Sequence, residues 1–344
     1  MKKNIGYLLL LIVLAVAVYF FVFRSRETTL NGKDNAFSVK DTSSINKIFL
    51  ADMSGRHITL QRTSDKWIMN NTHPVRSDVI QGLLSTIKEI EVKYPVAEIA
   101  HNNVVKELST TAIKVELYDK QNALIKSYYV GGPDPTQSGT YMILPNSDKP
   151  YVIYIPGFNG YVTTRYSLDT DVWRDRTIFS FSIPQISSVT VNYTDERRDS
   201  SFEINVVRPD SFQIKPLNGK VIGKPVMKEK LFLYLMAYSR VNAEGYKNNE
   251  PVKDSLLHTV PFCTITVVDK QGNPHICKCY HKEVSVETMK QFDENGQPVA
   301  FDEEHYYASI NDAKDFVMIQ QFHFGRIFKT YGYFFTPIMS PLKH

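Results

Sequence analysis

The chain has 344 residues, and its 40 Lys and Arg against 36 Asp and Glu give a formal net charge of +4. Four of the basic residues, Lys2, Lys3, Arg24 and Arg26, flank one apolar run, and without them the two signs balance at 36 each. This balance argues against a nucleic-acid or other polyanion partner. The length is typical of two domains, or of one domain built from two similar halves.

The apolar run extends from Ile5 to Phe23 without a charged residue. Its 19 residues are enough to cross a bilayer core of about 30 Å. We expect an uncleaved signal anchor, and the alternative is a cleaved signal peptide, because Ala15 and Ala17 form an A-x-A pair. A short basic tail favours a cytoplasmic N-terminus. The sequence therefore predicts a single-pass protein of the bacterial inner membrane with its ectodomain in the periplasm.

The predicted organisation has four parts. Residues 1–26 form the tail and the anchor, and residues 27–39 form a linker. In residues 40–180, short strands precede a helix capped by Ser77 or Asp78, because the apolar residues that follow have helical spacing. Further strands surround the turn after Asp119, and a short helix capped by Asp169 closes this first unit.

Residues 181–344 repeat the same order. The tripeptide Asp-Lys-Gln occurs at Asp119 and again at Asp269, and residues 140–164 align without gaps on residues 306–330 at an offset of 166. We therefore expect an α+β fold of two tandem, mainly antiparallel β units, each with one main helix. In the superposed units, Trp67 should occupy the place of Phe212, as an aromatic core residue beneath a helix.

A glycine pair, Gly131 and Gly132, leaves a predicted strand and is followed by Pro133 and Asp134. Phosphate-binding glycine loops open a helix, whereas this pair precedes another predicted strand. The second unit has a longer insert at 282–304 instead, without a glycine pair. The pattern predicts a broad turn, and we expect this loop and the insert at one common end of the sheets, where a ligand or partner would bind.

The order of these elements, with "VGGPDP", "GTYMIL" and the closing "WRDRTIF", resembles the domain-of-unknown-function family 4340. The similarity covers residues 40–180 well and the second unit loosely. A departure is "KELSTT" at 106–111, where the family often has Gly-Leu. The resemblance implies a membrane-anchored envelope protein that is accessory to a gliding-type ABC transporter, and it implies no catalytic residues.

The segment "PHICKCYH" offers metal ligands, because His275, Cys277, Cys279 and His281 would share one face of a strand. Ligands spaced about 7 Å apart cannot all surround one ion, so we expect the cysteines to pack as small core residues. A disulfide from Cys263 to one of them is the alternative. We expect no metal and no cofactor.

A second cluster combines Asp169, Asp171 and Asp175 with the aromatic Trp173, as in a glycosidase. The interleaved Arg174 and Arg176 favour ion pairs in a structural connector instead. The sequence carries no recognised catalytic motif, and we expect no enzyme.

Tyrosine-rich strands provide a third candidate surface, for a protein or a glycan. Its members would be Tyr128, Tyr129, Tyr151, Tyr154 and Tyr161. The function that we predict is a non-enzymatic scaffold that binds partner proteins, and the alternatives are an envelope hydrolase and a glycan-binding protein.

Overall fold

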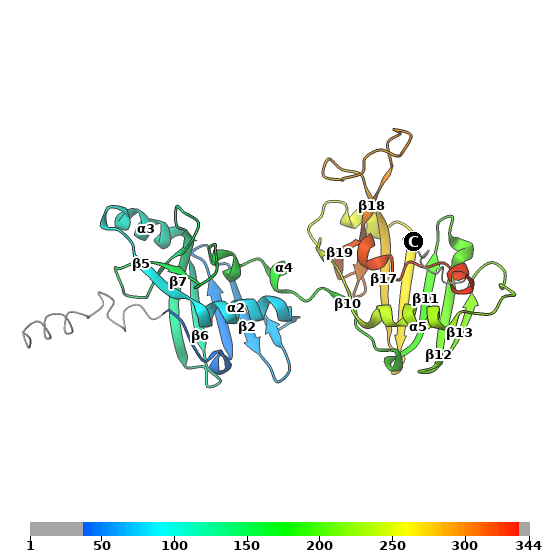
Figure 1. Ribbon diagram of the computed structural model, residues 1–344, viewed down its shortest axis with the longest axis horizontal. Helices are drawn as coiled ribbons and strands as arrows, with labels where there is room; N and C mark the ends of the chain where they lie inside the picture. Colours follow the sequence, from blue (N-terminus) through cyan, green and yellow to red (C-terminus); the bar gives the residue numbers. More distant parts are fainter. Residues whose placement is uncertain (1–36, 337–344) are drawn as a thin grey trace, which may run out of the picture. The chain divides into compact units, whose positions relative to one another are not determined.

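The computed structural model describes residues 37–336, and the chain divides into two compact units between Asp175 and Arg176. Each unit is built around one antiparallel sheet (Figure 1). The division lies five residues before the predicted boundary, because β10 (Thr177–Phe179) pairs with β14 (Val241–Asn242) of the second unit.

The first unit has a nine-stranded sheet in the order β4-β3-β2-β1-β6-β7-β8-β9-β5. Its strands are β1 (Lys47–Ala51), β2 (His57–Arg62), β3 (Trp67–Met69), β4 (His73–Pro74), β5 (Glu91–Pro95), β6 (Ile113–Tyr118), β7 (Leu124–Pro133), β8 (Thr140–Ile143) and β9 (Tyr151–Tyr154). Its helices are α2 (Ser77–Glu89), α3 (Glu98–Thr111), α4 (Thr170–Trp173) and the 3-10 helices η1 (Thr42–Ser44) and η2 (Thr163–Tyr166).

Helix α2 covers one face of this sheet and buries Ile80, Leu83 and Ile87, as the spacing predicts. Neither Ser77 nor Asp78 caps it, since the N-cap is Arg76. The Arg76 guanidinium instead holds the Asp78 carboxylate at 2.6 Å. The predicted cap was therefore wrong, because the carboxylate is engaged by a neighbouring cation.

Helix α3 was not predicted, and it corrects the expectation of one main helix in each unit. Its sequence includes two Asn and a Thr-Thr end, which are weak helix formers, and only Val104 and Leu108 are buried. These two side chains join Ala112, Tyr129 and neighbouring residues in a small apolar cluster against β7 and β8. Tertiary packing rather than local propensity therefore determines this helix.

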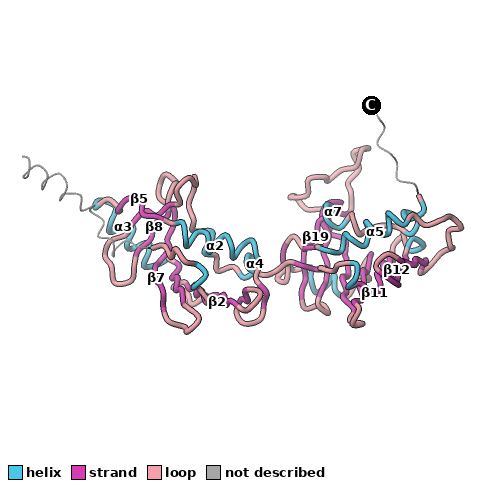
Figure 2. The backbone as a smooth tube through the Cα atoms, turned by 60° about the horizontal axis from the view of Figure 1, so that its bottom comes forward, coloured by secondary structure: helices cyan, strands magenta, loops and turns pink. Residues whose placement is uncertain are grey.

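The second unit has an eight-stranded sheet in the order β13-β12-β11-β16-β17-β18-β19-β15. Its strands are β11 (Ile186–Tyr193), β12 (Phe202–Arg208), β13 (Ser211–Pro216), β15 (Gly245–Tyr246), β16 (Cys263–Asp269), β17 (Pro274–Glu283), β18 (Phe301–Ile310) and β19 (Asp315–Gln320). Its helices are α5 (Lys228–Met236), α6 (Lys253–Leu257), α7 (Gln321–Phe324) and the 3-10 helices η3 (Ile183–Gln185), η4 (Arg198–Ser200), η5 (Ala237–Ser239) and η6 (Tyr331–Phe335). Figure 2 shows the helices and strands of each unit by colour.

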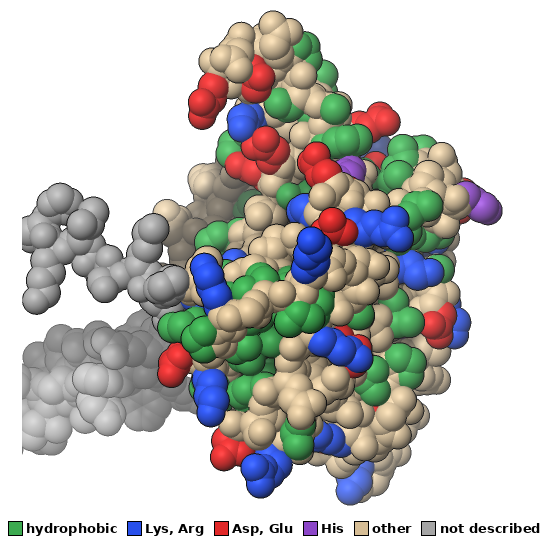
Figure 3. Space-filling model, turned by 90° about the vertical axis from the view of Figure 1, so that its right-hand side faces the viewer, with side chains coloured by type: hydrophobic (Ala, Val, Ile, Leu, Met, Phe, Trp, Pro, Cys, Tyr) green, Lys and Arg blue, Asp and Glu red, His purple; other side chains and the backbone are tan. Residues whose placement is uncertain are grey.

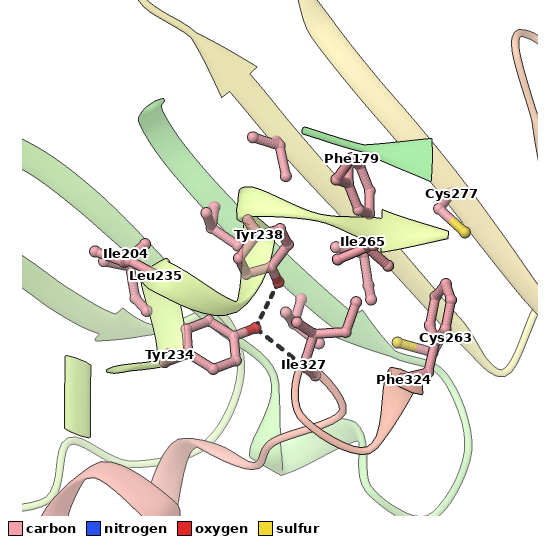
Figure 4. Packing of buried hydrophobic residues seen from close by; sticks show 14 of the residues in the cluster. Phe179, Ile204, Tyr234, Leu235, Tyr238, Cys263, Ile265, Cys277, Phe324 and Ile327 are labelled. Carbon is pink, nitrogen blue, oxygen red and sulfur yellow. Dashed lines mark hydrogen bonds between the residues drawn. The ribbon is translucent and has the colours of Figure 1, made fainter. Parts of the chain in front are cut away.

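The core of the second unit lies between its sheet and the layer that contains α5, α7 and η6. Tyr238 donates its hydroxyl hydrogen to Tyr234 at 2.7 Å, and Tyr234 donates to the carbonyl of Ile327 at 3.1 Å (Figure 4). Burial raises the pKa of both phenols well above 10, so both stay neutral. The buried hydroxyl groups are thus paired as a buried polar group requires.

The two sheets share one strand order, with β4 as an addition in the first. Tyr141 pairs with Val152 between β8 and β9, and Tyr307 pairs with Met318 between β18 and β19, so the offset of 166 holds on both strands. The Asp-Lys-Gln turns also agree, because Asp119 and Asp269 each accept a hydrogen bond from the backbone N–H four residues on. One fold is thus used twice.

The fold class predicted from the sequence needs one correction. Within residues 37–336, no helix is long and apolar enough to cross a membrane. The longest described helix, α3, has 14 residues, or about 21 Å, against a bilayer core of about 30 Å. The anchor predicted at residues 5–23 lies outside the described residues. For residues 37–336, the predicted fold class is corrected to two mainly antiparallel β units without a transmembrane helix. The same finding contradicts the predicted location in the inner membrane.

Candidate functional site

A cavity of about 670 Å³ lies in the second unit, between the ends of β17 and β18, the segment around α6 and the insert that joins the two strands. In the first unit the corresponding strands β7 and β8 are joined by a short turn from Asp134 to Gly139. In the second unit β17 ends at Glu283 and β18 begins at Phe301. The longer connection therefore forms a wall of the cavity that the first unit does not have.

A buried ion pair crosses the base of the insert. The Lys282 Nζ atom lies 3.0 Å from Asp302 Oδ2, and the two side chains are 17% and 3% exposed. Asp302 also accepts hydrogen bonds from the backbone N–H groups of Glu304 and His305. Burial raises the pKa of the Asp302 carboxyl, but Lys282 and these N–H groups outweigh burial and the pKa is lowered. Asp302 is therefore a fixed negative charge.

An imidazole lies between two carboxylates at the edge of this cavity. The His305 Nδ1 atom is 3.3 Å from Asp302 Oδ2, and its Nε2 atom is 3.7 Å from Glu244 Oε2. The backbone of Glu244 is held in turn by the Arg176 guanidinium, which donates to its carbonyl oxygen. The ring thus connects the two carboxylates, one on β18 and the other beside β15.

A phenol of the lining lies beside another charged pair. The Tyr307 hydroxyl donates to Glu250 Oε1 at 3.4 Å, and Lys247 Nζ lies 3.7 Å from Glu250 Oε2. Burial and the negative charge of Glu250 raise the pKa of Tyr307 to about 12. Tyr307 therefore remains a neutral hydrogen-bond donor near pH 7.

The charged side chains that line the cavity are unequal in sign. Two lysines, Lys247 and Lys282, face four carboxylates, so the balance is two minus four, or −2, with histidine neutral. The carboxylates are Glu250, Glu283, Glu287 and Asp302. Apolar side chains complete the lining, among them Val252, Leu256, Val284, Val286 and Met318. The cavity thus suits a ligand that combines a cation with apolar groups.

The predicted metal-ligand candidates do not form a metal site. Within residues 37–336, no group of three or more His, Cys, Asp or Glu side chains is arranged so that it could hold a metal ion. Cys277 and Cys279 are fully buried in the core with their sulfur atoms 3.8 Å apart. His275 bonds Asp269 at 3.2 Å, and His281 stacks between two phenylalanine rings, Phe262 and Phe301.

Cys263 pairs with Cys279 between β16 and β17. A two-residue turn at Gln271 and Gly272 would instead pair Cys263 with Tyr280, so the observed register differs from that of the simple turn by one residue. All three cysteines are free thiols. Burial raises the pKa of Cys263 and Cys279 well above 9, so both are protonated core residues.

The predicted glycine loop is instead the end of strand β7, which runs through Gly131, Gly132 and Pro133. The turn begins only at Asp134, whose carboxylate accepts from the N–H groups of Ser138 and Gly139. The prediction of a broad turn was therefore wrong for the two glycines, which the packing of α3 places in the sheet. Asp134 is 2% exposed and serves to shape the turn.

The acidic cluster around Trp173 lies on a structural connector. Asp169 caps α4 by accepting from the N–H of Asp171, which confirms the predicted cap. The fully buried Trp173 donates its indole N–H to the carbonyl of Ser167. The N–H of Asp175 donates to Pro74, and Arg174 forms a backbone bridge to Val75. These residues attach the end of the first unit to its β4 edge.

Trp67 and Phe212 occupy the same place in the two sheets. Trp67 pairs with Arg62 between β3 and β2, and Phe212 pairs with Val206 between β13 and β12. Trp67 is buried, whereas Phe212 is only partly buried against the core.

The five tyrosines proposed as a binding face do not form one surface. Tyr128 and Tyr151 are buried in the core, and Tyr129 packs on the other side of the sheet against the α3 cluster. Tyr154 and Tyr161 are partly exposed.

The cavity residues were missed at the sequence level, although the insert at 282–304 that forms a wall of the cavity was noticed. Lys282, Asp302, His305 and Tyr307 match no catalytic or binding motif, and Glu250 lies more than 30 residues away from them in the chain. The difference in length between the two repeats was the only signal that pointed to this region.

The comparisons with known proteins concern the first unit above all. A family model described as Domain of unknown function (DUF4340) matches residues 67–211. No curated protein matches the chain. No solved structure matches it.

The matched segment contains the glycine pair and the Trp-Arg-Asp-Arg segment on which the predicted resemblance depends, and it ends in β13, before the residues that line the cavity. The predicted resemblance is confirmed over this segment: residues 67–211 match the model of the family described as Domain of unknown function (DUF4340).

Proposed function

We propose that this chain is a non-enzymatic binding protein, whose second unit takes a basic side chain of a partner protein into the cavity beside the insert. The observation that carries this proposal is the charge of the lining, two lysines against four carboxylates. Lys247 and Lys282 are each paired with a carboxylate, whereas Glu283 and Glu287 form no salt bridge with a described residue. A Lys or Arg side chain of a partner would complement these two charges.

Binding explains the geometry better than catalysis does. General acid–base chemistry needs groups whose pKa lies near the working pH. The pKa of Asp302 is lowered and that of Tyr307 is raised to about 12, so neither group changes its charge near pH 7. Burial, followed by the nearby Arg197, lowers the pKa of His281, which is held between two aromatic rings. The polar groups are thus suited to orient a ligand.

A protein partner fits better than a small molecule because the insert exposes large apolar side chains near the cavity. Val286 lines the cavity and is 94% exposed, and Met289 and Phe292 of the same insert are also exposed. Exposed apolar groups around a polar centre are typical of protein–protein interfaces. The role as an accessory of an ABC transporter stays a prediction from the family resemblance.

The test is a selection of random 12-residue peptides displayed on phage against the full chain. We expect enrichment of peptides with Lys or Arg next to apolar residues. Replacing both Glu283 and Glu287 with Gln should weaken binding of the selected peptides about tenfold, or about 1.4 kcal/mol. The matched control is Glu294→Gln, which removes a charge from the same insert outside the cavity lining. Equal binding by the double variant and by the parent chain would refute the proposal.

A further inference from the structure

The helices α2 and α5 hold the same place in the two repeats, yet their outer faces differ. The exposed residues of α2 are polar and include Gln81, Lys88 and Glu89. The outer face of α5 presents Phe232, Leu233 and Met236, which are 45%, 56% and 48% exposed. Because the repeat shows that this position tolerates a polar surface, the fold itself does not require the apolar face of α5.

A hollow of about 400 Å³ adjoins this face. Its lining combines apolar side chains of α5, such as Leu233 and Met236, with Arg326, Lys329 and Tyr333 from the segment that follows α7. The lining contains two cations and no carboxylate. Neither Arg326 nor Lys329 has a salt bridge with any carboxylate of residues 37–336. The positive charge of the hollow is therefore not neutralised by a described residue.

A third cation lies against Tyr333, one of the residues that line the hollow. Lys230 is 6% exposed and donates from Nζ to the carbonyl of Tyr333 and to the hydroxyl of Thr336, at 3.0 and 3.1 Å. The ring of Tyr333 lies 4.2 Å from Lys230 Nζ and 5.2 Å from Lys329 Nζ. Burial and the charge of Lys230 lower the pKa of Lys329. An anion in the hollow would relieve the repulsion between these two lysines.

From this arrangement we propose that the outer face of α5 and the adjoining hollow dock a partner segment that carries apolar side chains next to Asp or Glu. The apolar residues of the partner would cover Phe232, Leu233 and Met236, and its carboxylates would pair with Arg326 and Lys329. Figure 3 shows one face of the molecule on which hydrophobic side chains gather with Lys and Arg side chains at their edges. Charge complementarity around an apolar centre would give such a site its specificity.

This docking surface is separate from the cavity beside the insert. The two share no lining residue, and their charges are opposite in sign. Binding at one can therefore fail while binding at the other persists.

The experiment measures binding of two labelled helical peptides to the full chain by fluorescence anisotropy. Both peptides carry one stripe of Leu, flanked by Glu in the first and by Gln in the second. We expect the Glu peptide to bind and the uncharged Gln peptide to bind at least about tenfold more weakly. Added salt should weaken binding of the Glu peptide, because the contacting charges lie near the surface.

Two variants test the two components of the surface. Replacing Arg326 and Lys329 together with Gln, or Leu233 and Met236 together with Ser, should each weaken the Glu peptide at least about tenfold. Lys120→Gln in a turn of the first unit controls for the loss of a positive charge, and the Glu283→Gln and Glu287→Gln pair controls for the cavity. Neither control should alter binding, and circular dichroism should show the same fold for every variant.

Three outcomes would overturn the proposal. The first is equal binding of both peptides, or binding that neither docking variant changes. The second is self-association of the chain that Leu233→Ser abolishes in analytical ultracentrifugation, which would assign the surface to a second copy. The third is peptide binding that appears only after truncation behind Thr336, which would assign it to the chain's own last residues.

Discussion

Leu108 of helix α3 lies directly over the backbone of Gly131 in strand β7. A Cβ atom added to Gly131 would lie 2.4 Å from Leu108 Cδ2 and 3.2 Å from the carbonyl oxygen of Tyr141. Val130 and Cys279 hold the same register in the two sheets, so the position in the second unit that is equivalent to Gly131 is Tyr280. The Tyr280 ring packs near Leu256 and Leu257 of the shorter helix α6. The glycine is therefore a site of close helix–sheet contact in one repeat and is not needed in the other.

Replacing Gly131 with Ala should destabilise the first unit by about 1–3 kcal/mol, because the added methyl group must displace Leu108. Gly132→Ala is the matched control, because its nearest neighbour is the Glu107 Oε1 atom at 2.8 Å, the mobile end of a flexible side chain. The measurement is urea unfolding followed by circular dichroism. Equal stability of the two variants would show that α3 does not depend on the close contact.

Trp67→Ala should lower the free energy of unfolding of the first unit by about 3–5 kcal/mol, since the buried ring would leave a cavity. Phe212→Ala, at the equivalent place in the second unit, should cost less because Phe212 is only partly buried. The measurement is proteolysis at increasing urea concentrations, which follows the unfolding of each unit separately. A larger loss for Phe212→Ala would contradict the difference in burial.

Asp302 should make the second unit sensitive to acid. Its pKa is lowered in the folded state, so its ionised form contributes stability above its unfolded pKa near 3.8, and this contribution disappears as the pH falls through the folded value. Asp302→Asn should cost about 1–3 kcal/mol at pH 7, because Lys282 and two backbone N–H groups lose a charged acceptor.

The stability difference between Asp302→Asn and the parent chain should shrink as the pH is lowered below about 4. Urea unfolding at pH 7, 5 and 3 measures it. A difference that stays constant over this range would show that Asp302 is not the titrating group.

The three cysteines should be inert in the folded chain. They are buried, and burial raises the pKa of Cys263 and Cys279, so a thiolate-specific reagent meets little thiolate and little access. We expect negligible reaction with an aromatic disulfide reagent under native conditions and reaction of all three thiols in denaturant. A Ser54→Cys variant, whose thiol would be exposed, provides the positive control. Rapid native reaction of the parent chain would contradict the core placement.

Strand positions, the repeat and the family resemblance of residues 67–211 could be predicted because they depend on local patterns. Alternating apolar residues such as Ile48 and Leu50 are buried in β1 and face one side of the sheet. The turn after Asp119 recurs after Asp269 because its carboxylate binds nearby backbone N–H groups within the same few residues. Such features require no partner from elsewhere in the chain.

Tertiary structure alone decided four features of the molecule: helix α3, the role of Gly131, the register of the cysteines and the cavity. Leu108 and Gly131 are 23 residues apart, and Glu250 and Tyr307 are 57 apart, so neither contact leaves a local pattern in the sequence. A hydrogen bond or a close packing contact acts over a few ångströms of space, whatever the distance along the chain. The sequence alone thus determined the repeated architecture, and the packing between distant segments decided where a ligand could bind.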